Sequence, residues 1–170
     1  VDLVVGAENY ASLTGRAYIF YNDGSIPTTG ATADVIISAS TVGQLFGDTL
    51  TAGDLNADGK ADLVVGSWDA SSLTDNVYVF YNDGTYPSLA SSADKIFSGS
   101  TTGEDFGLAI AVADMNIDGK PDLVAGAPGY SSSTGRVYTF ITETTVTATE
   151  TKAAEFKGSS GVIKGSFELK

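Results

Sequence analysis

The stretch Asp62-Leu-Val-Val-Gly66 (DLVVG) has an identical copy at Asp2–Gly6 and a near-identical one, DLVAG, at Asp122–Gly126. Each copy begins 60 residues after the one before it. Many other residues keep the same spacing: Tyr18, Tyr78 and Tyr138; Phe20, Phe80 and Phe140; the pairs Phe46-Gly47 and Phe106-Gly107; and YNDG at Tyr21–Gly24 and Tyr81–Gly84. A period of this length indicates supersecondary units that stack or are arranged radially.

Strand-length runs bounded by Gly, Asn, Asp, Ser and Thr fill each period, without a long apolar stripe at helical spacing. In the central period the expected strands cover residues 62–66, 76–81, 94–98 and 106–113. Between the second and third, Asp83-Gly84 accepts the positive φ that a tight hairpin turn needs. The predicted fold class is all-β, with roughly three antiparallel four-stranded repeats of about 60 residues. A β-sandwich is the alternative, although a sandwich has no reason to repeat such a unit.

The composition excludes several kinds of functional site. The chain contains no His and no Cys, so it has no Ser-His-Asp triad, no thiol nucleophile, no thiolate or imidazole zinc site and no disulfide. The net charge of -12 disfavours nucleic acids and anionic membranes as partners, and no apolar run approaches the ~20 residues of a membrane span. We therefore expect no catalytic residues, and hard cations are the natural partners of this chain.

Two aspartate-rich loops, residues 54–62 and 114–122, share the pattern DxNxDGxxD. Oxygen side chains at positions 1, 3 and 5 of such a loop converge on one point, and Gly at position 6 permits the sharp turn. The backbone carbonyl at position 7 and the carboxylate at position 9 add further oxygens, which suits Ca²⁺ better than the smaller Mg²⁺. The predicted calcium ligands are Asp54, Asn56, Asp58, Lys60 and Asp62 in one loop, and Asp114, Asn116, Asp118, Lys120 and Asp122 in the other.

These loops differ from an EF-hand, because position 12 is Val65 or Ala125 rather than Glu and a strand follows instead of a helix. A metal-free alternative is a pair of Asx-rich turns. Three carboxylates so close together would, however, repel one another strongly without a cation.

Three sequence elements recur in a fixed order: a Phe-Gly pair, the aspartate loop and DLVxG, with a Gly-Ala-Pro triplet at Gly126–Pro128 in the last repeat. This combination resembles the FG-GAP repeat of integrin α-subunit propellers and covers residues 1 to about 140. The resemblance implies a four-stranded propeller blade per repeat, a Ca²⁺ site in a loop at one rim and a ligand surface on the opposite face. It also implies that Asp2 is position 9 of a third loop. The triplets Gly6–Glu8 and Gly66–Trp68 depart from the pattern, so these loops are expected to differ in shape.

Two aromatic residues are candidates for ligand contact. Trp68 stands where the other repeats have Glu8 and Pro128, and an exposed indole can stack on a sugar or anchor a partner. Tyr130 precedes the Ser/Thr-rich residues 131–134, which could serve recognition in the same way. Packing in the core or between repeats is the alternative for Trp68, and a solvated loop is the alternative for Tyr130.

The two ends of the chain do not match a complete repeat. We expect residues 1–140 to form FG-GAP-type propeller repeats, and residues 141–170 to form a Thr-rich segment and a degenerate half-repeat that completes a blade or pairs with a neighbour. One chain alone is therefore not expected to close a ring. It would be a segment of a longer propeller, or a subunit that associates tail to head into an oligomer or filament.

The sequence thus predicts a calcium-stabilised, non-enzymatic scaffold for adhesion or assembly, at the cell surface or outside the cell, with a protein partner or a second copy of itself. A lectin-like, carbohydrate-binding propeller is the alternative, which Trp68 and Tyr130 exposed on one rim would support. A third possibility is a propeller attached to a hydrolase, as in certain phospholipases, with the catalytic residues elsewhere.

Overall fold

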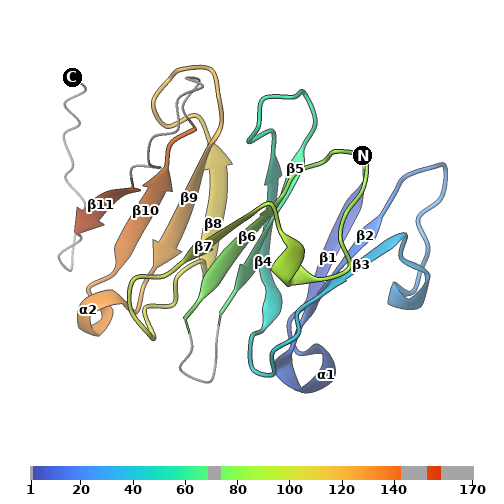
Figure 1. Cartoon of the computed structure of the whole chain (residues 1–170), viewed down its shortest axis with the longest axis horizontal. Coiled ribbons are helices and arrows are strands. Elements are labelled where there is room, and N and C mark those ends of the chain that lie inside the picture. Colours follow the sequence, from blue (N-terminus) through green and yellow to red (C-terminus); the bar gives the residue numbers. More distant parts are fainter. Residues whose placement is uncertain (1, 69–73, 143–152, 158–170) are drawn as a thin grey trace.

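The computed structural model describes residues 2–68, 74–142 and 153–157, and its strands form three antiparallel sheets (Figure 1). The first sheet has the order β1 (Leu3–Ala7), β2 (Arg16–Phe20), β3 (Val35–Ser38). The middle sheet has the order β4 (Phe46–Gly53), β5 (Asp62–Ser67), β6 (Asn76–Phe80), β7 (Lys95–Ser98). The last sheet contains β8 (Ala109–Ala113), β9 (Asp122–Ala127), β10 (Arg136–Phe140) and β11 (Ala153–Lys157), again in sequential order.

The predicted all-β fold class is confirmed, with one correction to where a sheet begins. Three strands expected in the central period are found as β5, β6 and β7, but the fourth, expected over residues 106–113, is β8 and belongs to the last sheet. This strand starts only at Ala109, after Asp105 (φ 57°) and Gly107 (φ 83°), which have left-handed backbone conformations. The equivalent Gly47 (φ 94°) lies at the irregular start of β4, where the pairing with β5 shifts register between Phe46 and Thr49. Each four-stranded sheet therefore begins at a Phe-Gly pair, as β4 does, or two residues after it, as β8 does.

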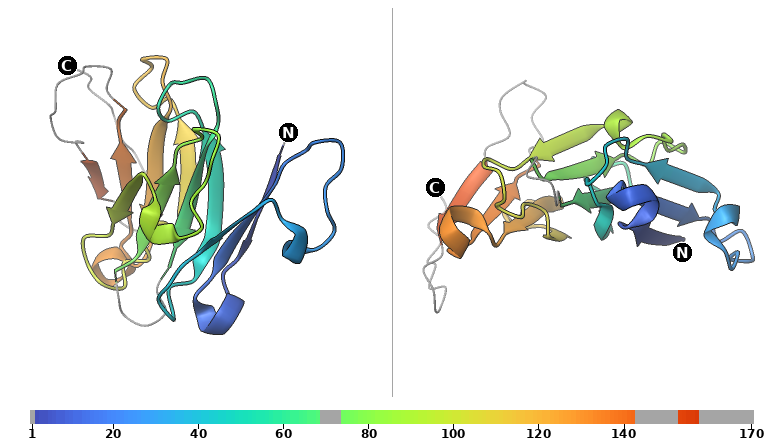
Figure 2. Two further views of the ribbon diagram at one scale, coloured as in Figure 1. Left: turned by 45° about the vertical axis from the view of Figure 1, so that its right-hand side comes forward. Right: turned by 90° about the horizontal axis from the view of Figure 1, so that it is seen from below.

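Viewed from below, the three sheets follow one another along a curved row (Figure 2). One apolar core lies between the first and middle sheets, and a second lies between the middle and last sheets. The middle sheet supplies both cores, because alternate residues of a strand face opposite sides. Thus Leu63 and Val65 of β5 belong to the first core, whereas Val64 belongs to the second.

The Phe-Gly pairs lie at these two interfaces. Phe46 is fully buried, and its ring meets those of Tyr78 and Phe80 edge-on at centroid distances of 5.3 and 6.3 Å. Gly47 has a φ of 94°, and a side chain on it would meet the carbonyl oxygen of Arg16 in the first sheet at 2.5 Å. Phe106 repeats the edge-on ring contacts between the middle and last sheets, with Tyr138 and Phe140. Gly107 has a φ of 83°, and a side chain on it would meet the side chain of Val77 at 2.6 Å rather than a backbone carbonyl. Each pair therefore combines a large apolar ring with a left-handed residue at a close contact, which favours Gly.

The prediction of a tight hairpin at Asn82-Asp83-Gly84 is wrong in one respect. A turn does form, since Gly84 has a φ of 101° and Asp83 Oδ1 accepts hydrogen bonds from the backbone N and Oγ1 of Thr85. However, β6 ends at Phe80 and β7 begins only at Lys95, with a single 3-10 turn at Ala90–Ser92 between them. The long connection brings Tyr86 back against the core between the first and middle sheets.

The C-terminal segment contributes an edge strand to the last sheet. β11 pairs antiparallel with β10, with Arg136 opposite Lys157 and Phe140 opposite Ala153. The rest of the degenerate half-repeat expected over residues 141–170 lies largely outside the described residues. The division of the chain at residue 140 remains a prediction.

Candidate metal loops

The two aspartate loops lie at the same rim of the molecule. Each connects the first strand of a complete sheet to its DLV strand, β4 to β5 and β8 to β9. Both loops project at the top of Figure 1, whereas the single turns α1 (Tyr10–Leu13) and α2 (Tyr130–Ser133) lie at the bottom. The predicted metal ligands and the candidate ligand contact Tyr130 are thus at opposite rims.

The first loop folds around its own backbone amides. The two carboxylate oxygens of Asp54 accept hydrogen bonds from the backbone N of Asp58 at 2.9 Å and of Gly59 at 2.8 Å. The amide oxygen of Asn56 also accepts from Asp58 N at 3.0 Å, and Asp58 Oδ1 accepts from Lys60 N at 2.9 Å. Ala57 and Gly59 have φ values of 60° and 86°, which produce the sharp turn expected at position 6. Positions 1, 3 and 5 are thereby held close together.

The second loop repeats this geometry. Asp114 accepts hydrogen bonds from the backbone N of Asp118 at 3.1 Å and of Gly119 at 2.8 Å, and Asp118 Oδ1 accepts from Lys120 N at 2.9 Å. Ile117 and Gly119 take the same left-handed conformations as Ala57 and Gly59, with φ values of 61° and 85°. Two independent loops with one hydrogen-bond pattern indicate that the DxNxDG sequence itself determines the local fold.

The carboxylates at position 9 have a structural role that the sequence pattern does not reveal. Asp62 is completely buried, and it accepts hydrogen bonds from the backbone N of Leu55 at 2.8 Å, Asn56 at 3.3 Å and Asn82 at 2.9 Å. Burial raises the pKa of Asp62, and these backbone hydrogen bonds oppose that rise. The carboxylate therefore ties the aspartate loop to the turn that follows β6.

The same link occurs in all three repeats. Asp2 Oδ1 accepts from the backbone N of Asn22 at 2.9 Å, and Asp122 Oδ1 accepts from the backbone N of Thr142 at 2.8 Å. In each case the acceptor begins a DLV stretch and the donor lies 20 residues later. A fixed 20-residue offset between Asp and the turn after the next strand is the signal from which this link could have been predicted.

The donor chemistry of the loops fits a hard cation. Each loop offers the side-chain oxygens of two Asp and one Asn, together with a backbone carbonyl at Lys60 or Lys120, and oxygen ligands of this kind suit Ca²⁺. The amine of Lys60 lies outside this set, since it donates to the carbonyl of Asn82 at 3.2 Å. Among the described residues, no group of three or more Asp, Glu, His or Cys side chains is arranged so that it could hold a metal ion. Calcium binding by the two loops remains a prediction.

The two aromatic candidates make contacts within the chain. Trp68 is partly buried, and its indole Nε1 donates to Asp105 Oδ1 at 2.9 Å, which joins the end of β5 to the segment that leads into the last sheet. Tyr130 packs against the second core, and the guanidinium of Arg136 lies 3.3 Å from its ring centroid. Ligand contact by Trp68 and Tyr130, and with it the lectin-like alternative, remains a prediction.

Residues 54–125 match a family model described as an FG-GAP-like repeat. The chain is also similar to integrin alpha-4 of Xenopus laevis, with 31% identity over 144 residues, covering 81% of this chain and 13% of that protein. It is similar to integrin alpha-PS5 of Drosophila melanogaster, with 35% identity over 135 residues, covering 75% of this chain and 12% of that protein.

A third relative is the phosphatidylinositol-glycan-specific phospholipase D of Bos taurus, with 39% identity over 109 residues, covering 56% of this chain and 13% of the enzyme. The chain thus spans only about an eighth of the length of these curated relatives. In the described part of the chain, no helix is long and apolar enough to cross a membrane. The repeated Phe-Gly pairs, the aspartate loops, the antiparallel sheets and these matches together show that the chain belongs to the FG-GAP repeat family of the integrin α type.

Proposed function

We propose that this chain is a calcium-stabilised, non-enzymatic scaffold for protein interaction or adhesion, acting outside the cell or at its surface. The observation that carries this proposal is the pair of aspartate loops with the same hydrogen-bond pattern at one rim. Similarity to integrin α chains supports the interaction role and the location. The non-enzymatic role is supported by a sequence without His or Cys, and the phospholipase D relative is matched over only 13% of its length.

The residues that would hold Ca²⁺ are those at positions 1, 3, 5, 7 and 9 of each loop, with Lys60 and Lys120 contributing their backbone carbonyls. Bound calcium would neutralise the negative charge that the loop aspartates concentrate. The chain's own residues hold the donors in place, because left-handed residues at positions 4 and 6 turn the loop and Asp62 or Asp122 attaches it to the sheet.

Thermal unfolding in millimolar Ca²⁺ and in excess chelator tests the proposal. Calcium at about 100 times its dissociation constant adds ~2.7 kcal/mol per site, so the melting temperature should be clearly higher with calcium. In calorimetric titration, Asp58→Ala and Asp118→Ala should each remove one bound ion. Asp23→Ala, an aspartate in a turn outside both loops, is the matched control and should keep both ions. Equal melting temperatures in calcium and chelator would overturn the calcium part of the proposal.

Self-association is a second candidate function, favoured by an exposed face on the first sheet. Leu3 and Val5 are each 42% exposed, whereas their counterparts in the middle sheet, Leu63 and Val65, are covered by the sheet that precedes them. In the middle sheet, Val64 and Val77 pack against the last sheet. The last sheet has Val124 and Val137 at the equivalent positions, and both are partly buried. The face of the last sheet that carries Val124 and Val137 could therefore pack on the Leu3 and Val5 face of the first sheet of a second copy. Such a contact would be head to tail.

Light scattering at micromolar concentration tests this candidate. The wild-type chain should form oligomers or filaments, and Leu3→Lys or Val5→Lys should weaken them because each places a charge in the contact. Ile117→Lys, at a position 86% exposed on the loop rim, should leave the assembly intact. A stable wild-type monomer would contradict self-association without affecting the calcium proposal.

A further inference from the structure

Four Asp-Gly dipeptides occur in the chain, and the structure divides them into two kinds. Asp58-Gly59 and Asp118-Gly119 lie in the aspartate loops, whereas Asp23-Gly24 and Asp83-Gly84 lie in the turns after β2 and β6. All four glycines have a positive φ, and a Cβ on any of them would meet no atom within 4 Å. Asp-Gly is the dipeptide most open to isomerisation, because no side chain shields the glycine nitrogen.

Isomerisation rearranges the main chain without changing its mass. The glycine nitrogen attacks Cγ of the aspartic acid, and an N–Cγ bond forms while the N–H proton and the carboxyl OH leave as water. Water then adds to the main-chain carbonyl carbon of the resulting succinimide and breaks the bond of that carbon to nitrogen. The main chain afterwards runs through the side chain of the residue, now isoaspartate. Because the nitrogen must turn toward Cγ, contacts that hold the amide or the carboxylate slow the reaction.

In the aspartate loops the glycine nitrogen is already held. Gly59 N donates to Asp54 Oδ2 at 2.8 Å, and Gly119 N donates to Asp114 Oδ2 at 2.8 Å. The carboxylate that would be attacked is also fixed in both loops, because it accepts a hydrogen bond at 2.9 Å from the backbone N two residues later. Hydrogen bonds to a carboxylate are among the stronger ones in proteins, and they must break before the ring can close. The two loop sites are therefore protected.

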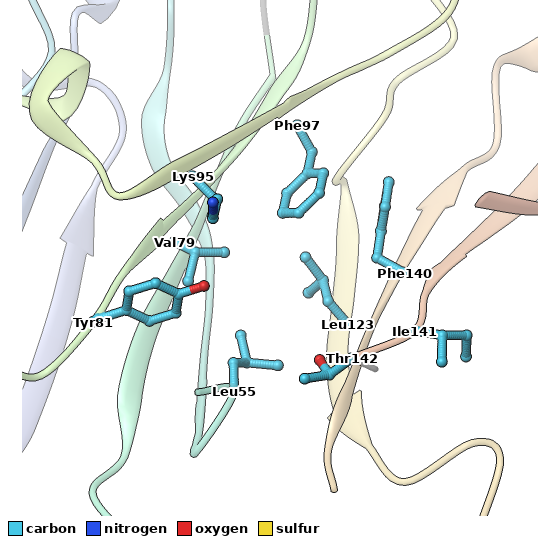
Figure 3. A pocket seen from close by; sticks show the side chains of 9 residues that line it. All are labelled: Leu55, Val79, Tyr81, Lys95, Phe97, Leu123, Phe140, Ile141 and Thr142. Carbon is cyan, nitrogen blue, oxygen red and sulfur yellow. The ribbon is translucent and has the colours of Figure 1, made fainter. Parts of the chain in front are cut away.

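In the turns after β2 and β6 the glycine nitrogen is not held in this way. Within the described part of the chain, neither Gly24 N nor Gly84 N donates a hydrogen bond. Each turn begins at a tyrosine that packs against a core, Tyr21 in the first turn and Tyr81 in the second, where the ring lies near Val79 (Figure 3). The Asp-Gly pairs that follow these tyrosines are exposed. Both turn sites are thus more open to ring closure than the loop sites.

The two turns differ in how firmly the aspartate is held. Asp83 Oδ1 accepts hydrogen bonds from the backbone N and from Oγ1 of Thr85, both at 2.9 Å. These bonds lower the pKa of Asp83, and since ring closure consumes the neutral carboxyl group, a lower pKa slows it further. For Asp23, the described residues provide one hydrogen bond to the carboxylate, from Ser25 N at 3.4 Å. Asp23 is therefore the least restrained of the four aspartates.

We propose that Asp23 is a site of spontaneous isoaspartate formation, at which the folded chain is modified before its three other Asp-Gly dipeptides. The new linkage inserts a methylene into the main chain next to Asn22, whose backbone N donates to Asp2 Oδ1 at 2.9 Å. Isomerisation thus alters the link between β1 and the turn after β2, and it leaves the two aspartate loops intact. The reaction needs only water, and it does not depend on bound calcium or on self-association.

The test compares isoaspartate formation in the folded chain with that in guanidinium chloride, during weeks at neutral pH with excess chelator. Electron-transfer fragmentation of the digested chain distinguishes isoaspartate from aspartate at each position. The rate in the folded chain, divided by the rate at the same dipeptide in the unfolded chain, is independent of the residue that follows the glycine. This ratio should be at least about tenfold lower at Asp58 and Asp118 than at Asp23, and about fivefold lower at Asp83. A ratio at any of these three sites that equals or exceeds the ratio at Asp23 would overturn the proposal.

Thr85→Val tests whether hydrogen bonding causes the difference between the two turns. This substitution at an exposed residue removes the hydroxyl that donates to Asp83 and keeps the β-branched shape. The ratio at Asp83 should rise about threefold, and the ratio at Asp23 should not change. Thr85→Ser, which keeps the hydroxyl, is the matched control and should leave both ratios unchanged. No rise at Asp83 in Thr85→Val would contradict the physical basis of the proposed order.

Discussion

Two segments with the same sequence, DLVVG at Asp2–Gly6 and at Asp62–Gly66, have very different surroundings. Both are strands in antiparallel sheets, and both link their Asp to a turn 20 residues later. Leu3 is 42% exposed, however, whereas Leu63 is 3% exposed, because the middle sheet has a neighbour on each face and the first sheet has a described neighbour on one face only. Identical residues can therefore contribute very different free energies of unfolding.

The largest expected effect comes from removing the ring that closes the first interface. Phe46→Ala leaves a cavity beside Tyr78 and Phe80 and should lower the free energy of unfolding by about 3–5 kcal/mol, measured by urea denaturation. It would also make the Leu63 face of β5 resemble the exposed Leu3 face of β1. A loss below about 1 kcal/mol would mean that Phe46 does not close this interface.

A matched pair of substitutions measures the comparison directly. Leu63→Ala should cost about 2–5 kcal/mol of unfolding free energy, since Leu63 is buried between two sheets, whereas Leu3→Ala should cost less than about 1 kcal/mol. Both values come from urea denaturation of the dilute chain, because association would also cover Leu3. Equal losses in the dilute chain would show that Leu3 is buried in solution, which would break the comparison.

The smallest effect separates the two aspartates that begin these strands. Asp62→Asn should cost about 2 kcal/mol, because a buried carboxylate that accepts three backbone hydrogen bonds becomes a neutral amide with one acceptor oxygen. Asp2→Asn should cost only a few tenths of a kcal/mol, because Asp2 is exposed and accepts one such bond. Thermal unfolding in excess chelator measures both without a contribution from metal. A larger loss for Asp2→Asn would contradict the assigned burial.

Much of the fold could be predicted from the sequence because the information is local and repeated. The all-β class, the three strands at β5, β6 and β7 and the turn at Gly59 follow from strand-length runs, the 60-residue period and the needs of a left-handed residue. The start of β8 and the long connection after Phe80 were mispredicted. The late start of β8 follows the left-handed backbone at Asp105 and Gly107, and the long connection after Phe80 packs Tyr86 against the core between the first and middle sheets. Neither feature has a clear signal in the neighbouring residues of the sequence.

The repeat, the strands β5, β6 and β7 and the order of oxygen donors in the aspartate loops follow from the amino-acid sequence alone, because short motifs specify each of them. The packing of the sheets, in contrast, buries Leu63 while it leaves Leu3 exposed, and it brings Asp62 to the turn at Asn82. Burial depends on which surfaces meet, and that is set by how the sheets pack rather than by any one stretch of sequence.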